Sequence, residues 1–285
     1  MYKKFYGLRE KPFALTPDPA FLYLGRHHER ALLHLEYGLA NEAAFVLITG
    51  EVGSGKTTLI RHLLQRVDAQ STVGLIANTA RDTGRLLQWV CAAYGLDTAG
   101  KDDVALYHAF IDFAIEEYAE GRRVVLIVDE AQNLGRARLE ELRVLSNVNA
   151  DKHLVLQTVL VGQPELRDLM RTPQLRQFAQ RIGADYHIGK LSAAETVEYV
   201  RHRLRVAGAP RTDIFRTAAL QLVHESSRGI PRLVNQLCDT ALVYGYAEQR
   251  ERIDAELMQD VIRDRCEGGI FPGVMVGQKT PPGRP

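Results

Sequence analysis

The stretch "ITGEVGSGKTTLIRHLL", from Ile48 to Leu64, constrains the fold of this chain more than any other. Residues 50–57 match G-x-x-x-x-G-K-[ST] at every fixed position, between an apolar strand-like run and an amphipathic helical pattern. Glycines let consecutive backbone N–H groups converge on phosphate oxygens, and the positive end of the following helix points to the same place. The stretch therefore predicts a strand, a phosphate-binding loop and a helix.

The loop predicts a nucleoside triphosphate site that takes ATP and Mg²⁺. We expect Lys56 to reach the β- and γ-phosphates and the Thr57 hydroxyl to coordinate Mg²⁺. The alternative, a glycine-rich turn before a helix, is disfavoured by the strand and helix on either side. The expected nucleotide-binding residues of the loop are Gly50, Glu51, Val52, Gly53, Ser54, Gly55, Lys56, Thr57 and Thr58.

The segment "VVLIVDEAQNL" supplies the acidic half of the expected site. Its aliphatic residues deliver Asp129 and Glu130 to the carboxyl end of a strand, the edge at which open α/β sheets bind ligands. We expect Asp129 to hold Mg²⁺ through water, and Glu130 to orient or deprotonate the attacking water. An isolated acidic pair after a strand is commonly a solvated helix cap, but next to a phosphate loop the adjacent Glu130 favours hydrolysis over mere binding.

Three further polar residues are candidates for contact with the γ-phosphate. Gln163 follows the run "LVLQTVLVG" and is either a contact to the phosphate or its water, or a cap before a proline. Arg181 precedes the last expected strand and could reach a neighbouring subunit's nucleotide; Arg176 is the competing candidate, and a surface salt bridge is the alternative for both. Arg232 falls in the first turn of a helix, where a positive charge opposes the helix dipole, so an anionic ligand would explain its placement.

Short apolar runs alternate with helical patterns over the first two thirds of the chain. The runs are rich in Val, Ile and Leu and mostly lack polar alternation, which is typical of parallel strands covered on both faces. The alternation predicts an α/β fold with a doubly wound parallel sheet. The expected strands are 44–50, 71–77, 123–130, 154–162 and 184–189, and expected helices include 26–40 and one around 104–118.

The strand pattern ends at about Leu191, and only helical patterns follow. Ser192 and Glu195 form a capping box, and Gly208 is the expected C-cap of that helix. Further helices are expected at 213–226, 231–249 and 254–266. We therefore predict an arm and helix packing on the core (1–40), a phosphate-loop core (41–190), an all-helical lid (191–266) and a disordered tail (267–285).

Composition excludes several classes of protein. The formal net charge is +1, and the three cysteines (Cys91, Cys238 and Cys266) lack metal-ligand spacing. The amino terminus does not resemble a signal peptide, and no apolar stretch approaches the roughly 18 residues that a membrane span needs. We expect a cytoplasmic protein without a transmembrane segment, held peripherally at the inner membrane through partners at most.

Together these motifs resemble the AAA+ ATPases. The segments "FYGLREKPFALTPDP", "HERALLHLEYGL", "VDEAQNL" and "LVGQPEL" resemble the ExeA/GspA group of secretion-, pilus- and exopolysaccharide-associated ATPases and, more distantly, the TnsC/TniB transposition ATPases. The resemblance implies a P-loop AAA+ core with a five-stranded parallel sheet between helices and a C-terminal helical lid. It also implies roles for individual residues: Lys56 and Thr57 as Walker A, Asp129 and Glu130 as Walker B, Gln163 as sensor 1, Arg181 as the finger, Arg232 as sensor 2, and Phe21–Tyr23 as a wall for adenine.

Three functions are compatible with these features. The first is a cytosolic Mg²⁺-dependent ATPase, a homo-oligomeric ring or filament with Arg181 acting in trans. It would drive or switch the assembly of an envelope secretion, pilus or exopolysaccharide export system through a protein partner. Larger ExeA-type proteins continue into a membrane helix and a periplasmic peptidoglycan-binding domain, which this sequence lacks, so direct insertion of a pore through the cell wall is not expected.

The second function is an ATP-dependent DNA-binding regulator that recruits a transposase. Arg81, Arg85, Arg136 and Arg138 follow expected strands and could line a channel for DNA, although a solvated charged face is the plainer interpretation. The third is a nucleotide-binding scaffold with negligible turnover.

Overall fold

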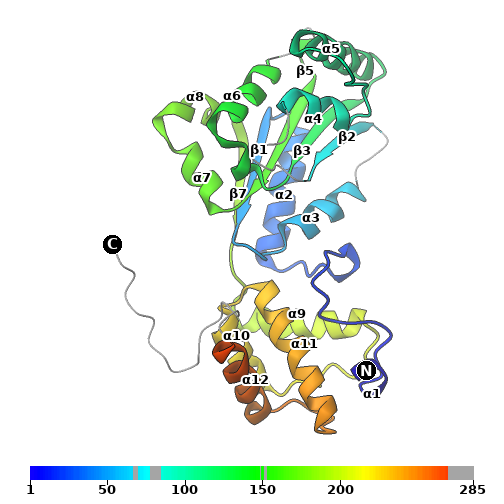
Figure 1. Ribbon diagram of the computed structural model, residues 1–285, viewed down its shortest axis with the longest axis vertical. Coiled ribbons are helices and arrows are strands. Elements are labelled where there is room, and N and C mark those ends of the chain that lie inside the picture. The colour runs from blue at the N-terminus through cyan, green and yellow to red at the C-terminus, as the bar shows by residue number, and fades with distance from the viewer. Residues whose placement is uncertain (67–69, 78–84, 148, 151–152, 269–285) are drawn as a thin grey trace. The chain divides into compact units, whose positions relative to one another are not determined.

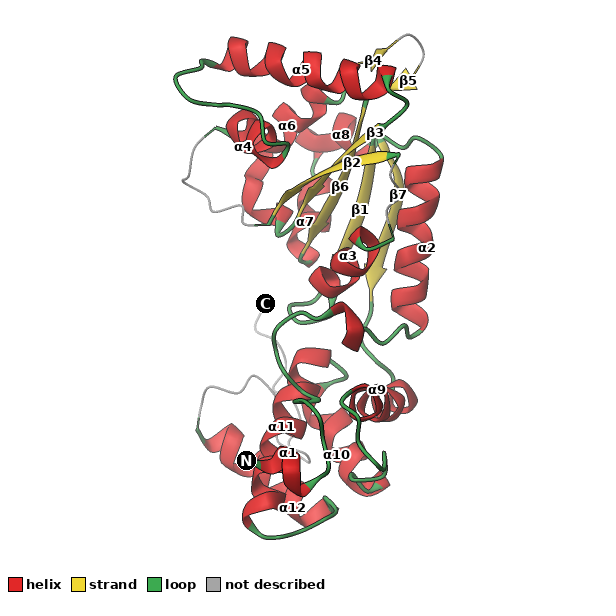
Figure 2. Ribbon diagram, turned by 90° about the vertical axis from the view of Figure 1, so that its right-hand side faces the viewer, coloured by secondary structure: helices red, strands yellow, loops and turns green. Residues whose placement is uncertain are grey.

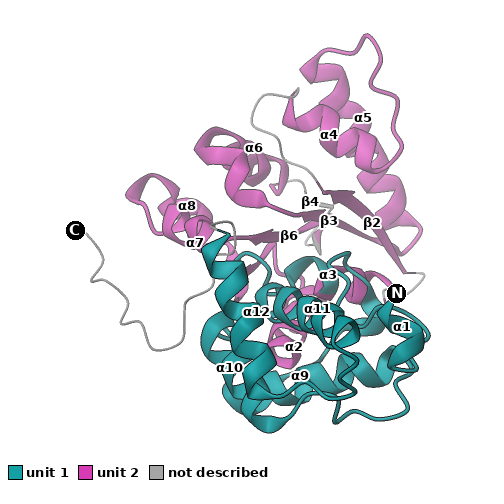
Figure 3. Cartoon of the chain, turned by 60° about the horizontal axis from the view of Figure 1, so that its bottom comes forward, with its two compact units in different colours: residues 1–26, 52–58, 189–285 teal, residues 27–51, 59–188 magenta. Residues whose placement is uncertain are grey.

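A computed structural model describes residues 1–66, 70–77, 85–147, 149–150 and 153–268. The chain divides into two compact units (Figure 3). The core unit comprises His27–Glu51 and Leu59–Ile188, and the lid unit comprises Met1–Arg26, Val52–Thr58 and the chain from Gly189 onward. The phosphate loop thus groups with the helical region. The expected tail lies outside the described residues beyond Gly268.

The core unit is built on a five-stranded parallel sheet (Figure 1). The strand order is β2-β3-β6-β1-β7, so the first strand of the chain lies near one edge rather than at it. The predicted α/β class and all five predicted strands are confirmed. Their bounds are β1 (Phe45–Gly50), β2 (Ser71–Ile76), β3 (Arg123–Val128), β6 (Leu156–Gly162) and β7 (Ile182–Ile188); a separate antiparallel pair, β4 (Asn149–Ala150) and β5 (His153–Leu154), was not predicted.

Helices cover both faces of the sheet (Figure 2). One face buries alternate strand residues, such as Phe45 and Leu126, in a core with α4 (Leu86–Ala93), α5 (Asp103–Ala119), α6 (Gly135–Leu145), α7 (Pro164–Met170) and α8 (Arg176–Ala179). The other face packs against α2 (Arg26–Ala40). Gly38 makes this close approach possible, because a Cβ there would lie 2.4 Å from Val46 Cγ2.

The lid unit is helical, as predicted. Its four main helices are α9 (Ala193–Val206), α10 (Thr217–Ser227), α11 (Pro231–Ala247) and α12 (Ala255–Glu267). The capping box is confirmed, since the Ser192 hydroxyl accepts from Glu195 N and the Glu195 carboxylate accepts from Ser192 N. The second helix begins later than the expected residue 213, because Phe215 is extended and forms a parallel bridge with Ile253.

The amino-terminal arm (Met1–Arg26) belongs to the lid unit, whereas the arm and helix of residues 1–40 were expected to pack on the core. The arm begins with a short helix, α1 (Tyr2–Phe5). Five apolar side chains of the arm are buried in the lid's hydrophobic core. The buried Arg203 of α9 fastens the arm by donating hydrogen bonds to the carbonyls of Pro12 and Ala14. The apolar arm residues in that core are Tyr2, Tyr6, Leu8, Phe13 and Phe21.

Among the described helices, none combines the length and apolarity that crossing a membrane requires.

A buried carboxylate ties α5 to the edge strand β2. Glu117 accepts hydrogen bonds from Arg122 Nε and Nη2, both at 2.6 Å, and from the Thr72 hydroxyl on β2. The hydrogen bonds from Arg122 are the main reason that the pKa of Glu117 falls from 4.5 to about 2. The ionised form of Glu117 is therefore favoured in the folded protein. Its carboxylate supplies the hydrogen-bond acceptors for Arg122, between α5 and β3, and for Thr72 on β2.

Replacing this carboxylate is expected to reduce the stability of the core unit. Glu117→Gln should lower the free energy of unfolding at pH 7 by about 1–3 kcal/mol, because it leaves the Arg122 and Thr72 donors poorly matched. Because the folded pKa is depressed, the carboxylate's contribution is complete above about pH 4.5 and is lost as the pH falls toward 2. Urea unfolding at pH 7 and pH 3 should therefore show a difference between wild type and variant that narrows in acid.

Glu120→Gln is the matched control, because Glu120 also pairs with Arg122 but has 61% of its side chain exposed. It should change stability little. If both variants lost the same free energy of unfolding, or if the effect of Glu117→Gln did not depend on pH, the Glu117 carboxylate would not be the stabilising group.

Candidate functional site

The phosphate loop has the backbone geometry that its sequence predicts. β1 ends at Gly50, and α3 (Lys56–Leu64) begins at the lysine of the motif. Gly53 and Gly55 have φ values of +79° and +96°, conformations that other residues rarely adopt. The N-terminus of α3 therefore follows directly on a glycine-shaped turn, which is the arrangement that presents backbone N–H groups to an anion.

The lid unit brings Arg232 to this loop. The Arg232 backbone N–H donates to the Gly53 carbonyl at 3.2 Å. A Cβ on Gly53 would lie only 2.4 Å from Arg232 Cβ, so the loop and the first turn of α11 are packed directly together. The phosphate loop and the first turn of α11 thus meet within one unit, although about 180 residues of chain separate them. Each was predicted independently as a phosphate contact.

The turn before α11 is equally constrained. Gly229 has a φ of +71°, and a Cβ on it would lie 2.0 Å from the Leu191 carbonyl oxygen. Leu191 N donates to the Gly229 carbonyl at 2.9 Å, and Pro231 then occupies the first position of the helix. This "RGIPR" turn fixes the point at which α11 starts and therefore the position of Arg232.

The acidic pair lies at the carboxyl end of β3, as predicted. Asp129 is buried, with 6% of its surface exposed, and its Oδ1 accepts from the Glu130 backbone N–H at 2.9 Å. Glu130 has left-handed backbone angles (φ 53°, ψ 37°), which are uncommon for a residue with a side chain. Such conformations concentrate at functional sites, where the surrounding structure enforces them.

Two amides hold the Glu130 carboxylate. Its Oε2 accepts from Gln163 Nε2 at 2.9 Å and from Gln132 Nε2 at 2.6 Å. The Gln163 backbone N–H in turn donates to Gln132 Oε1 at 3.1 Å. The structure therefore brings the predicted Glu130 and Gln163 together and adds Gln132, which was not predicted from the sequence.

This convergence follows from the sheet topology. β3 and β6 are parallel neighbours, with Val128 aligned to Leu160, so the residues after both strands emerge at one edge. β1 lies on the other side of β6, and Gly50 ends it at the same edge. Strand order cannot be read from local sequence, and the proximity of Gln132 to Gln163 depends on it.

Arg181 is engaged within its own chain. Its Nη1 donates to the Arg143 carbonyl at 3.2 Å and to the Ser146 hydroxyl at 2.6 Å, both at the C-terminal end of α6. A guanidinium there satisfies helix carbonyls and complements the negative end of the helix dipole. Arg176 is exposed at the start of α8, and its side chain makes no ion pair or hydrogen bond with the residues that the structure describes.

Phe21 is buried in the lid, with 5% of its surface exposed. The Arg203 guanidinium carbon lies 4.8 Å from its ring centroid, and the neighbouring Tyr23 ring packs against Tyr199 and His202. These contacts occupy both rings and disfavour the role in adenine binding that the resemblance implied.

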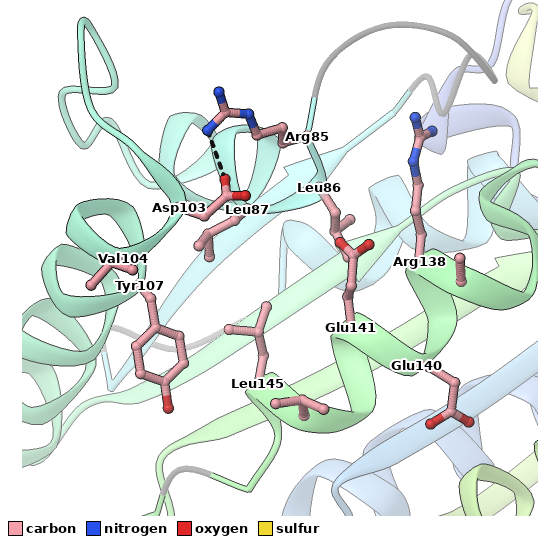
Figure 4. Close-up of a pocket in the computed structure, with 12 residues that line it drawn as sticks. Arg85, Leu86, Leu87, Asp103, Val104, Tyr107, Arg138, Glu140, Glu141 and Leu145 are labelled. Atoms are coloured by element: carbon pink, nitrogen blue, oxygen red, sulfur yellow. Dashed lines mark hydrogen bonds and ion pairs between the residues drawn. The ribbon is translucent and has the colours of Figure 1, made fainter.

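A cavity of about 710 Å³ opens on the core unit between α4, α5 and α6 (Figure 4). It contains none of the predicted nucleotide-binding residues, but Arg85 and Arg138, two of the arginines considered for DNA, line it. Arg85 is paired with Asp103 at 3.0 Å, and Glu140 and Glu141 add further negative charge. Carboxylates thus outnumber guanidiniums here, which disfavours a phosphate backbone as ligand; Arg81 lies outside the described residues.

The fold and the family comparison agree on the class of protein. Residues 40–170 match the family model of the AAA domain. With a five-stranded parallel sheet, a phosphate loop and a helical C-terminal region, the chain has the P-loop AAA+ fold that the sequence predicted.

The more specific resemblance is also confirmed. The chain is 44% identical over 281 residues to the General secretion pathway protein A of Aeromonas hydrophila, an alignment that covers 97% of this chain and 51% of that protein. The chain thus spans about half the length of that relative.

Solved structures of low sequence identity share the fold. The ORC2 protein of Aeropyrum pernix superposes with a TM-score of 0.67 at 20% identity, covering 90% of this chain and 71% of that one. Cdc6p of Pyrobaculum aerophilum gives 0.66 at 17% identity (87% and 70%), and the RuvB branch-migration motor of Thermotoga maritima gives 0.52 at 18% identity (86% and 70%). At these identities the likeness concerns the fold alone.

The contact between the loop and α11 predicts the effect of a small substitution. Gly53→Ala requires a strained positive φ and places Cβ against Arg232, so we expect the affinity for ATP to fall at least about tenfold. Titration of the purified chain with a fluorescent ATP analogue measures this loss.

Gly95→Ala separates the two causes. Gly95 has a similar φ of +73°, but nothing lies within 4 Å of the added Cβ. It should cost stability without weakening nucleotide binding. If both variants bind ATP as the wild type does, the packing of Arg232 on the loop is not required for binding.

Proposed function

We propose that this chain is an Mg²⁺-dependent ATPase that hydrolyses ATP to ADP and phosphate. One observation carries the proposal: the Glu130 carboxylate, next to the buried Asp129, is held by Gln163 at the sheet edge where β1 leads into the phosphate loop. A site that only bound nucleotide would not need a strained, doubly hydrogen-bonded carboxylate at this position.

The residues present fit an ATP–Mg²⁺ ligand. Bound ATP would supply the phosphoanhydride bond to be broken, and Mg²⁺ would supply charge neutralisation. The loop backbone and Lys56 would bind the phosphate oxygens, and Thr57 and Asp129 carry oxygen atoms of the kind that Mg²⁺ prefers and would be its ligands. Glu130 orients the attacking water and accepts its proton, and Gln163 steadies Glu130. Arg232, placed by the lid against the loop, offsets the negative charge at the γ-phosphate end.

The biological process is inferred from the relative. Identity of 44% to a General secretion pathway protein A over nearly the whole chain supports a role in secretion. We propose that this role is to drive or switch the assembly of an envelope secretion, pilus or exopolysaccharide export system. We place the protein in the cytoplasm, at the inner membrane only through a protein partner. The alternative of a transposition regulator on DNA is less well supported, because Arg85 is paired with Asp103 in a cavity with an excess of carboxylates.

We further propose that the active form is a homo-oligomer in which an arginine from one subunit completes the site of the next. Arg181, predicted for this role, already donates two hydrogen bonds to the end of α6 in its own chain. The exposed guanidinium of Arg176 is available to a neighbouring subunit, and it is the better candidate for the finger.

Separating binding from hydrolysis tests the ATPase assignment. Lys56→Ala should abolish ATP binding, whereas Glu130→Gln should bind ATP normally and slow single-turnover phosphate release by about 10²–10⁴-fold, the usual contribution of a general base. Glu141→Gln, an exposed carboxyl on α6, is the control and should retain the wild-type rate. A wild-type rate for Glu130→Gln would refute the role of Glu130.

Mixing experiments test the finger. Arg176→Ala alone should lose about 10³-fold or more in turnover while folding normally, because a finger arginine acts on transition-state charge. Mixing it with Lys56→Ala should restore partial activity, since an intact loop can meet an intact arginine at mixed interfaces. Arg181→Ala should instead lower the melting temperature. If activity returned when Lys56→Ala was mixed with Arg181→Ala but not when it was mixed with Arg176→Ala, Arg181 would be the finger arginine.

A further inference from the structure

Gln132 is a polar residue of the core unit that the proposed reaction does not yet use. It lies in the short 3₁₀ turn Ala131–Leu134 that follows Glu130, and its side chain is half-buried. Both ends of its amide are engaged: Nε2 donates to Glu130 Oε2 at 2.6 Å, and Oε1 accepts from the Gln163 backbone N–H at 3.1 Å. The side chain thus bridges the segments that follow β3 and β6.

The neighbouring backbone leaves space for this bridge. Gly162 ends β6, and a Cβ there would lie 2.8 Å from Gln132 Oε1 and 2.7 Å from Leu166 Cδ2. Its φ does not lie in the left-handed region, so the glycine is required for space rather than for conformation. The amide is therefore packed closely against the end of β6, and its orientation is fixed by contact as well as by hydrogen bonds.

Glu130 needs such support. Its left-handed backbone is an unfavourable conformation for a residue with a side chain, and that side chain has three rotatable bonds. A single hydrogen bond from Gln163 allows the carboxylate to pivot about that contact, whereas a second donor from Gln132 restricts it. A displacement of about 1 Å in a catalytic group can cost on the order of 10²-fold in rate.

We propose that Gln132 is a positioning residue, which aligns the Glu130 carboxylate and couples it to the β6–α7 junction through the Gln163 amide. This inference rests on the proposed ATPase function. The amide serves both purposes, because Glu130 requires a donor and the Gln163 N–H requires an acceptor. A glutamate at position 132 would keep the acceptor but place two carboxylates together; a methionine of similar length would supply neither partner.

Gln132→Met and Gln132→Glu separate the two contacts. Both should lower the single-turnover rate by about 10–100-fold while the Kd for ATP stays within about twofold, because the proposed effect lies in the chemical step. In the nucleotide-free chain, amide hydrogen exchange at Gln163 should accelerate in Gln132→Met and remain protected in Gln132→Glu. Gln180→Met, at an exposed position, is the matched control and should leave rate, affinity and exchange unchanged.

The double variants decide whether Gln132 acts through Glu130. If it does, Gln132→Met should have no further effect on the rate in a Glu130→Gln background. Gly162→Ala, which pushes on the Gln132 amide from the other side, should show the same pattern. Additive losses, a weakened affinity for ATP or an unchanged rate would overturn the inference. An unchanged rate in Glu130→Gln itself would instead overturn the proposed ATPase function, so the two failures are distinguishable.

Discussion

The parallel pairing of β3, β6 and β1 is the constraint on which the candidate site depends. Because these strands run in one direction, the residues that follow them emerge at one edge of the sheet. Asp129 and Glu130 follow β3, Gln163 follows β6, and the phosphate loop follows β1. The acidic and amide groups, which are distant along the chain, therefore lie at one edge of the sheet, where Gln163 donates to the Glu130 carboxylate.

Glycine supports this arrangement in two physically different ways. Gly53 combines a positive φ with close contact to Arg232, so it serves both backbone conformation and packing. Gly162 has an ordinary backbone and serves only to leave room for the Gln132 amide. The distinction matters for interpreting sequences. A glycine such as Gly53 can be recognised from the phosphate-loop motif, whereas the need for Gly162 depends on β3 being the neighbour of β6.

Much of the fold was predictable because the relevant signals are local. Runs rich in Val, Ile and Leu predicted the five strands, and Ser192 with Glu195 predicted the start of α9. What could not be predicted depends on distant contacts. The arm was expected to pack on the core, yet four of its aromatic residues are buried in the hydrophobic core of the lid unit. Gln132 carries no local signal of its role, since its partners, Glu130 and Gln163, meet only when β3 and β6 become neighbours.

The arginines show why position relative to a helix is more informative than residue type. The guanidinium of Arg181 lies at the C-terminal end of α6, where the helix dipole and the free carbonyls both favour a cation, so its placement needs no ligand. Arg203 is buried and satisfied by the carbonyls of the arm. Arg232 is exposed in the first turn of α11, where the dipole disfavours a cation, and its backbone is fixed against the phosphate loop. Of the three, only Arg232 has a charge that opposes its own helix dipole, and an anion bound at the loop would offset this electrostatic cost. In the proposed function, this difference links the lid to nucleotide binding.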